Sequence, residues 1–203
     1  FGKEVSAERL EDEQFSAAFR ARVGFVFQNT DAQVFSPTVR EEIAFGPLQL
    51  GLAPDEIEAR IADVAQMLEI GDLSERAPYQ LSAGQKKRVA IASVLVMNPE
   101  LLLFDEPTAG LDPRSRGWLL ELIDELGRAG KTIVFATHDL AELEWIADRC
   151  LVLSEDHRLL AQGAPVEILA DRELLLRANL IHEHAHRHGA VLHSHAHERG
   201  HHG

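Results

Sequence analysis

The segment that most restricts the fold of this chain is an apolar run that ends in two carboxylates. Leu101 to Phe104 are large apolar residues, and Asp105-Glu106 follow directly. Such a run predicts a strand buried on both faces of a parallel sheet. Ligands bind at the carboxyl ends of these strands, where an Asp can hold Mg²⁺ and a Glu can act as a general base on water. A solvated acidic turn explains the pair alone equally well.

Predicted strands and helices alternate along the chain. The predicted elements are strands at 22–27 and 132–136, both expected to be buried, helices at 82–97, 114–129 and 140–147, a mostly helical stretch at 37–80, a hairpin formed by 150–153 and 158–161, and a last helix that begins at Pro165. This alternation predicts an α/β fold with a parallel sheet.

The helix at 82–97 begins with Leu81-Ser82-Ala83-Gly84-Gln85. Ser82 is a good N-cap, and the small residues after it are expected to leave bare backbone N–H groups at the helix N-terminus. Bare N–H groups and the helix dipole favour phosphate oxygens, and Lys86-Lys87-Arg88 add positive charge nearby. An ordinary capped helix with a basic first turn is the alternative interpretation.

Charge and composition exclude several classes of function. The net charge of −13 argues against a protein whose main role is to grip nucleic-acid phosphates. The mostly apolar stretch from Val89 to Met97, which Ser93 interrupts, is far too short to cross a membrane, and no secretory signal is visible. The single cysteine, Cys150, excludes an intramolecular disulfide framework.

Two polar residues follow the other predicted strands. Gln28 comes after the strand at 22–27, and His138 comes after the strand at 132–136. A Gln in that place can sense Mg²⁺ or water, and a His can contact a γ-phosphate or the attacking water. Taken one at a time, each is more often a packed or solvated residue.

The order of these motifs resembles that of the ABC (ATP-binding cassette) ATPases, over roughly residues 20–165. In that family they correspond to the Q-loop, the signature motif, the Walker B carboxylates, the D-loop and the switch histidine, here Gln28, Leu81–Gln85, Asp105-Glu106, Leu111-Asp112 and His138. Segments 26–39, 41–47 and 85–92 resemble the energy-coupling-factor ATPases in particular, with the cobalt and nickel importers as the closest likeness.

The resemblance implies a P-loop NTPase-like parallel sheet flanked by helices, with an inserted helical subdomain. The implied organisation is a partial ATPase core with the Q-loop at 1–36, a helical subdomain with the signature helix at 37–97, an ATPase core at 98–180 and a disordered histidine-rich tail at 181–203. It also implies an ATPase that drives transport with ATP and Mg²⁺ as cofactors.

The resemblance assigns roles to individual residues. Asp105 would coordinate Mg²⁺, Glu106 would deprotonate water, His138 would contact the γ-phosphate and Gln28 would link the metal site to the membrane partner. Two cassettes, alike or different, would pair head to tail. Residues that would act across this pair are Ser82, Gly84 and Gln85, which would bind the partner's γ-phosphate, and Asp112, which would tie the two sites together.

The same resemblance implies transmembrane partner subunits, no nucleic-acid partner and a peripheral place at the cytoplasmic face of the membrane. The helical stretch would face the membrane subunit. Its candidate docking residues are Phe35, Val39, Ile43, Phe45 and Leu48, most of which are expected to be core.

One expected motif is missing from the sequence. The phosphate loop G-x-x-x-x-G-K-[ST] is absent, because Gly130-Lys131-Thr132 has Glu125 where the first Gly belongs, and Gly2-Lys3 is followed by Glu4. We therefore expect that the chain lacks an N-terminal segment that carries this loop. The intact protein is expected to hydrolyse ATP, and this chain alone is expected to bind ATP poorly.

The tail at 181–203 holds nine of the 11 histidines. Most of them alternate with other residues, and the alternating ones are His182, His184, His186, His188, His193, His195 and His197. Imidazole is a preferred ligand of Ni²⁺, Co²⁺, Cu²⁺ and Zn²⁺, so the tail is predicted to bind a transition metal. It is expected to be disordered without metal, and a solubilising tail is the alternative.

Two other functions are compatible with a cassette of this kind. One is a chromosome-maintenance or DNA-repair cassette, which the short segment between Gln28 and Ser82 and the acidic charge disfavour. The other is a non-catalytic cassette remnant that binds metal through its tail and partners through its helical stretch.

Overall fold

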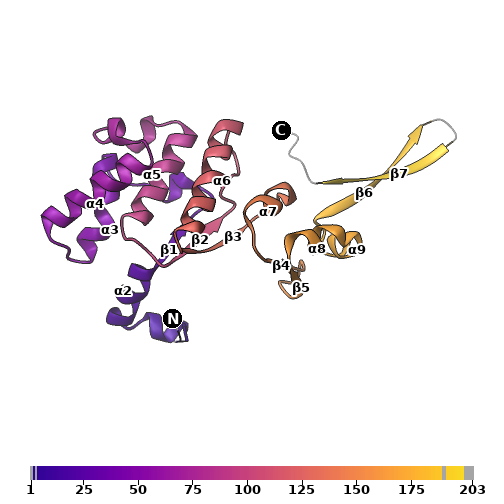
Figure 1. Cartoon of the computed structure of the whole chain (residues 1–203), viewed down its shortest axis with the longest axis horizontal. Coiled ribbons are helices and arrows are strands. Elements are labelled where there is room, and N and C mark those ends of the chain that lie inside the picture. The colour runs from indigo at the N-terminus through magenta and orange to yellow at the C-terminus, as the bar shows by residue number, and fades with distance from the viewer. Residues whose placement is uncertain (1, 3, 189–190, 199–203) are drawn as a thin grey trace. The chain divides into compact units, whose positions relative to one another are not determined.

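The computed structural model describes residues 2, 4–188 and 191–198 (Figure 1). The chain divides into two compact units, Phe1–Ala136 and Thr137–Gly203. This boundary falls inside the ATPase core segment that the sequence predicts at 98–180.

A three-stranded parallel sheet forms the centre of the first unit. Its strands are β1 (Val23–Val26), β2 (Leu101–Asp105) and β3 (Thr132–Ala136), in the order β1-β2-β3. Val26 pairs with Phe104, and Phe104 pairs with Phe135. The predicted parallel sheet is thus confirmed, and the three strands end at the same edge.

Only one face of this sheet is well buried, so the prediction of strands buried on both faces was wrong. Val26, Leu102 and Phe104 lie on the same face and are at most 2% exposed. On the other face, Phe25 is 41% and Val134 is 52% exposed. Apolar residues on both faces of a strand predict a layer on each side, but within the described residues of the first unit no layer seals the face of Phe25 and Val134.

The buried face of the sheet packs against helix α5 (Ala83–Leu95) at a glycine. A Cβ atom added to Gly24 of β1 would lie 2.2 Å from Val94 Cγ1 and 3.1 Å from Leu102 Cδ2. The helix therefore approaches the strand this closely because residue 24 has no side chain.

We expect Gly24→Ala to destabilise the first unit by about 1–3 kcal/mol, because the added methyl overpacks the contact with Val94. Val94→Ala in the same chain makes room for it, so the double variant should be less destabilised than the sum of the two single variants. Urea unfolding of the four proteins measures both effects. Simple additivity would show that Val94 is not the obstacle.

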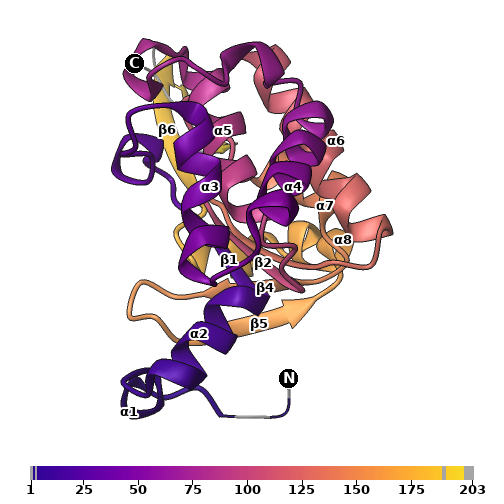
Figure 2. The same ribbon diagram turned by 90° about the vertical axis from the view of Figure 1, so that its left-hand side faces the viewer.

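The part of the chain between β1 and β2 is mostly helical. They are α3 (Val39–Gln49), α4 (Pro54–Met67) and α5, with short 3-10 turns at η1 (Thr30–Ala32), η2 (Gly71–Leu73) and η3 (Pro78–Gln80). Helix α3 lies beside both α4 and α5, and Figure 2 shows the three as one group. The predicted helical stretch at 37–80 is confirmed.

The remaining helices of the first unit lie on either side of this region in the sequence. Helix α6 (Pro113–Arg128) matches its prediction. Two helices that the sequence analysis did not predict, α1 (Ala7–Leu10) and α2 (Glu13–Arg22), begin at the N-cap side chains of Ser6 and Asp12. Among the described residues, none of the helices combines the length and apolar character that crossing a bilayer requires.

The second unit has its own small core. Helices α7 (Leu140–Ile146), α8 (Pro165–Ala170) and α9 (Arg172–Arg177) accompany an antiparallel pair, β4 (Cys150–Leu153) and β5 (Leu159–Gly163). The predicted hairpin and the helix that begins at Pro165 are confirmed. The buried residues of this core include Leu140, Cys150, Val152, Ile168 and Leu174.

The histidine-rich segment differs from its prediction. Instead of a disordered tail, strand β6 (Ile181–His188) pairs antiparallel with β7 (Val191–Glu198). The physical reason lies in the sequence, because a histidine at every second position gives the period of two that a strand requires. Residues 189–190 and 199–203 of the predicted tail lie outside the described residues.

Candidate functional site

The C-terminal edge of the parallel sheet gathers three of the predicted site residues. Asp105 is the last residue of β2, Glu106 follows it, and Gln28 lies two residues beyond β1. Because β1 and β2 are paired neighbours and run in parallel, these residues emerge at the same edge. Asp105 and Glu106 are half-buried, and Gln28 is exposed.

Glu106 has an unusual backbone conformation. Its φ angle is +41°, in the left-handed region that non-glycine residues rarely adopt, and its N–H donates to the Ala136 carbonyl of β3 at 2.9 Å. Strain of this kind costs of order 1–3 kcal/mol and concentrates at functional sites. The strained residue is the same one that the sequence predicts as the general base.

Lys87 is buried beneath this edge, with 2% of its surface exposed. Its Nζ donates to the carbonyl oxygens of Phe27 and Gln28, at 3.3 and 3.4 Å. Burial lowers the pKa of Lys87, and the negative charge of Asp105 partly opposes this shift. A single cation from α5 thus lies under the Q-loop residue and near the Walker B carboxylate.

Two further side chains fix the loop between β1 and α3. Gln33 accepts from the Phe27 N–H at 3.0 Å and donates to the Ala90 carbonyl of α5 at 2.9 Å. Glu42, which is 3% exposed, accepts from the N–H groups of Phe35 and Ser36 at 2.9 and 2.8 Å. The sequence analysis missed both residues.

The N-terminus of α5 is more completely capped than the sequence predicts. Ser82 and Gln85 form a capping box, in which the Ser82 N–H donates to Gln85 Oε1 and the Gln85 N–H donates to Ser82 Oγ. Among the described residues, the N–H groups of Ala83 and Gly84 have no hydrogen-bond partner. Two donors therefore remain at the helix N-terminus for an anion.

The three basic residues after Gln85, which were predicted to add positive charge near this helix end, have three different surroundings, and Arg88 lines the same cleft as Ser82 and Gln85. Lys86 pairs with Asp31, and Lys87 is buried as described. Arg88 donates to the Leu68 carbonyl at 2.7 Å and lies over the Trp118 ring, with its guanidinium carbon 4.1 Å from the ring centroid. Consecutive helical residues point about 100° apart, so each finds a different neighbour.

Asp112 holds the N-terminus of α6 beside the N-terminus of α5. Its carboxylate accepts from the Arg114 N–H, the Ser115 N–H and the Ser115 hydroxyl, at 3.0, 3.1 and 2.7 Å. These hydrogen bonds, with the hydroxyl first, lower the pKa of Asp112. Ser115 in turn lies against Gly84, where an added Cβ would be 2.5 Å from Ser115 Oγ.

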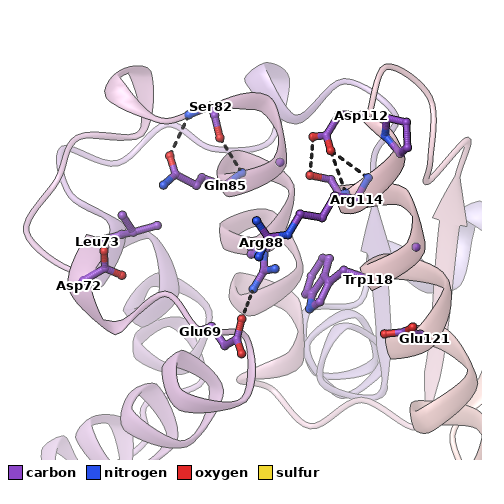
Figure 3. A pocket seen from close by; sticks show the side chains of 14 residues that line it. Glu69, Asp72, Leu73, Ser82, Gln85, Arg88, Asp112, Arg114, Trp118 and Glu121 are labelled. Atoms are coloured by element: carbon purple, nitrogen blue, oxygen red, sulfur yellow. Dashed lines mark hydrogen bonds and ion pairs between the residues drawn. The ribbon is translucent and has the colours of Figure 1, made fainter.

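The two helix ends share one cleft of about 830 Å³. Figure 3 shows Arg88 of α5 beside Trp118 of α6, with Ser82 and Gln85 at the N-terminus of α5 and Asp112 at the N-terminus of α6. The structure thus brings the predicted signature residues and the predicted D-loop residue together in one place. This arrangement suits an anionic group that approaches from outside the unit.

The false phosphate-loop match is placed at the opposite edge of the sheet. Lys131 precedes β3, and its Nζ donates to the Pro99 carbonyl, which precedes β2, at 2.7 Å. The N-terminal edge of a parallel sheet is not where such folds bind ligands. The prediction that Gly130-Lys131-Thr132 is not a phosphate loop is confirmed.

His138 belongs to the second unit, in the turn before α7. Its role beside Asp105 and Glu106 therefore stays a prediction. The predicted metal-binding histidines lie at positions 182–188 and 193–197 of strands β6 and β7. Among the side chains that the structure describes, no three His, Cys, Asp or Glu residues are placed to hold a metal ion.

The candidate docking residues separate into two groups. Val39 and Ile43 are 1% exposed and belong to the core. Phe35, Phe45 and Leu48 are 67%, 44% and 60% exposed, and the rings of Phe35 and Phe45 meet edge to face at 5.1 Å. Phe45 and Leu48 are one turn apart on α3, so these three residues are expected to share one exposed apolar patch.

Comparison with known proteins identifies the family. Residues 3–109 match the ABC transporter family. The energy-coupling factor transporter ATP-binding protein EcfA of Methanothermobacter thermautotrophicus is 47% identical over 161 residues, which cover 79% of this chain and 51% of that protein. The nickel import ATP-binding protein NikO of Rhodobacter capsulatus is 46% identical over 184 residues, which cover 89% of this chain and 72% of that protein.

Among solved structures, CbiO1 from Clostridium perfringens, described as part of the ABC transporter complex CbiONQ, superimposes with a TM-score of 0.71 at 39% identity. The match covers 83% of this chain and 67% of that one. This chain therefore spans about half to three quarters of the length of these relatives. Sequence, sheet topology and motif order agree: the chain belongs to the ABC transporter ATPases and, within them, to the energy-coupling-factor group.

Proposed function

We propose that this chain forms part of the ATP-hydrolysing subunit of an energy-coupling-factor importer, and that the imported ion is nickel or cobalt. The observation that carries the ATPase proposal is the shared sheet edge of Gln28, Asp105 and the strained Glu106. The name of the relative NikO and the histidine-rich hairpin of this chain support a nickel or cobalt substrate.

The residues at the sheet edge fit Mg²⁺ in their chemistry. The Asp105 carboxylate and the Gln28 amide offer hard oxygen ligands, and the buried Lys87 holds the backbone of residues 27 and 28 in place. When bound, the ion would supply positive charge that neutralises the phosphates. Asp105 would hold it, and Gln28 would link it to the membrane partner.

Glu106 would then act on water. Its carboxylate takes a proton from the water that attacks the γ-phosphate, and the strained backbone fixes the position of the residue on the sheet edge. His138 would contact the γ-phosphate. These roles amount to positioning and charge stabilisation, which supply most of the catalysis in phosphoryl transfer.

The N-terminus of α5 would complete the site of a second copy. The N–H groups of Ala83 and Gly84 and the exposed Ser82 form an anion site that needs a phosphate from outside this unit. Asp112 lies in the same cleft and would tie the two sites of the pair together. The pair of cassettes would be head to tail.

The exposed patch of Phe35, Phe45 and Leu48 would dock a transmembrane subunit, and the protein would then lie at the cytoplasmic face of the membrane. The patch continues directly from the loop that carries Gln28. Gln33 and Glu42 fix that loop to α5 and α3, so a movement at the nucleotide would reach the patch through hydrogen-bonded backbone.

The proposed ATP site predicts a difference between this chain and a chimaera. In the chimaera, the phosphate-loop segment of an ABC transporter ATPase precedes residue 1. By isothermal titration calorimetry, the chimaera should bind Mg-ATP in the micromolar range, and the chain alone should show no saturable binding below about 1 mM, because it lacks the loop's backbone donors and Lys.

Each half of this experiment can fail separately. Micromolar binding to the chain alone would show that the missing loop is not required. A chimaera that binds no ATP would contradict the proposed function itself.

A further inference from the structure

The pairing of β6 with β7 places histidine opposite histidine three times. The register is antiparallel and runs without a break from Ile181, opposite Glu198, to His188, opposite Val191. The histidine pairs are His182 with His197, His184 with His195, and His186 with His193. Each pair is called a rung below.

The three rungs share one face of the hairpin. Successive residues of a strand alternate between faces, and cross-strand partners share a face. Positions 182, 184 and 186 of β6 therefore lie on the same face, and so do their partners on β7. The positions in between form the other face, where Glu183 pairs with Ala196, Ala185 with Ser194 and Arg187 with Leu192.

The spacing of the rungs suits a metal ion. Cross-strand partners have Cβ atoms about 4.5–5.5 Å apart, and neighbouring rungs are about 7 Å apart along the strand. Imidazole binds Zn²⁺ at about 2.0–2.1 Å and suits Ni²⁺ and Cu²⁺ as well, whereas Mg²⁺ prefers oxygen ligands. Two neighbouring rungs thus offer four histidine positions within a span that one such ion can bridge.

We propose that this face of the β6–β7 hairpin, where three histidine rungs follow one another, is a binding site for a divalent transition-metal ion. A two-stranded hairpin is only marginally stable in water, so an ion held between rungs stabilises the pairing of the strands. The site needs neither ATP nor a second cassette. The proposal goes beyond the proposed function, in which nickel or cobalt is only the imported ion, because it assigns a metal-binding site to this chain.

A composition-matched variant separates this site from a loose histidine chelator. The four substitutions Ser194→His, His195→Ser, Ala196→His and His197→Ala keep the number of histidines and move two of them to the other face. The probe is NiCl₂, titrated into the full chain by calorimetry, with MgCl₂ as the negative control. A double variant of the other face, Glu183→Ala with Ser194→Ala, serves as the matched control.

The unaltered chain and the control should bind Ni²⁺ and not Mg²⁺, and the moved-histidine variant should bind Ni²⁺ about tenfold more weakly or worse. Ni²⁺ should also slow amide hydrogen exchange at 181–198 in the unaltered chain. Equal affinity of the unaltered chain and the moved-histidine variant would overturn the proposal, and so would an unaltered chain that does not bind Ni²⁺. Neither outcome bears on ATP hydrolysis, so the proposed function is tested separately.

Discussion

Replacing Glu106 by Gln in the phosphate-loop chimaera is expected to lower the rate of ATP turnover by about 10²- to 10⁴-fold. The amide keeps the size of the side chain but cannot take a proton from water. Binding of Mg-ATP should persist, because Asp105 and the phosphate loop are unchanged. Steady-state phosphate release measures the rate, and calorimetry measures the binding.

The control for this variant is Glu125→Gln. Glu125 is an exposed carboxylate on α6, which is a different element from the strands that end at the sheet edge. Its loss should leave turnover unchanged. If Glu106→Gln turned over at the rate of the unaltered chimaera, Glu106 would have no role as the general base.

Replacing the buried Lys87 by Glu is expected to destabilise the first unit by about 3–5 kcal/mol. The new carboxylate would face the carbonyl oxygens of Phe27 and Gln28, which accept hydrogen bonds and cannot donate one to it. The negative charge of Asp105 would also repel it. Lys87→Met keeps the apolar stem and should cost much less. Urea unfolding at pH 7.5 measures both, and equal stability of the Glu and Met variants would contradict the placement of Lys87.

The same residue predicts a pH dependence. Burial lowers the pKa of Lys87 below its ordinary value of 10.5. Between the lowered pKa and 10.5 the unfolded chain binds more protons than the folded chain, so the free energy of unfolding gains a contribution that rises with pH. Lys87→Met lacks that contribution, and the stability difference between the two proteins should shift in favour of the unaltered chain as pH rises through this window. A difference that is constant with pH would show that Lys87 does not titrate in this way.

The elements were predictable where local signals were strong. The apolar run at 101–104, the N-cap at Ser82 and the proline at 165 each locate a strand or helix to within a few residues. The grouping of Gln28 with Asp105 followed from topology alone, since parallel strands end at the same edge. The exposed face of Phe25 and Val134 was not predictable, because an apolar residue does not report whether a neighbour covers it.

The side chains that fix the site were harder to predict. Gln33 and Glu42 have the pattern of solvated loop and helix residues, and only the fold reveals that each satisfies buried backbone groups. Lys87 lies four residues before the buried Ile91 on the same side of α5, but Lys86 and Arg88 lie at the same spacing before the buried Ala90 and Ala92. Helical spacing therefore does not single out Lys87 among the three basic residues, and only the fold reveals which of them is buried.

The central claim is that the carboxylates of one copy and the α5 N-terminus of another form a single ATP site. Two chimaeras test it, one with Glu106→Gln and one with Ser82→Arg, each inactive by itself. In a head-to-tail pair of the two, one site carries both changes and the other carries neither. A chimaera with both changes, mixed in equal amounts with the unaltered chimaera, is the control: its mixed pairs contain no intact site if the site is shared, so about a quarter of the unaltered activity is expected, whereas sites confined to one copy would give about half.

Mixing the two inactive chimaeras in equal amounts and measuring ATP turnover tests the claim directly. The shared site predicts that activity returns to about a quarter of the unaltered level, because half of the pairs are mixed and each mixed pair has one intact site. A mixture that stays as inactive as its components would contradict it.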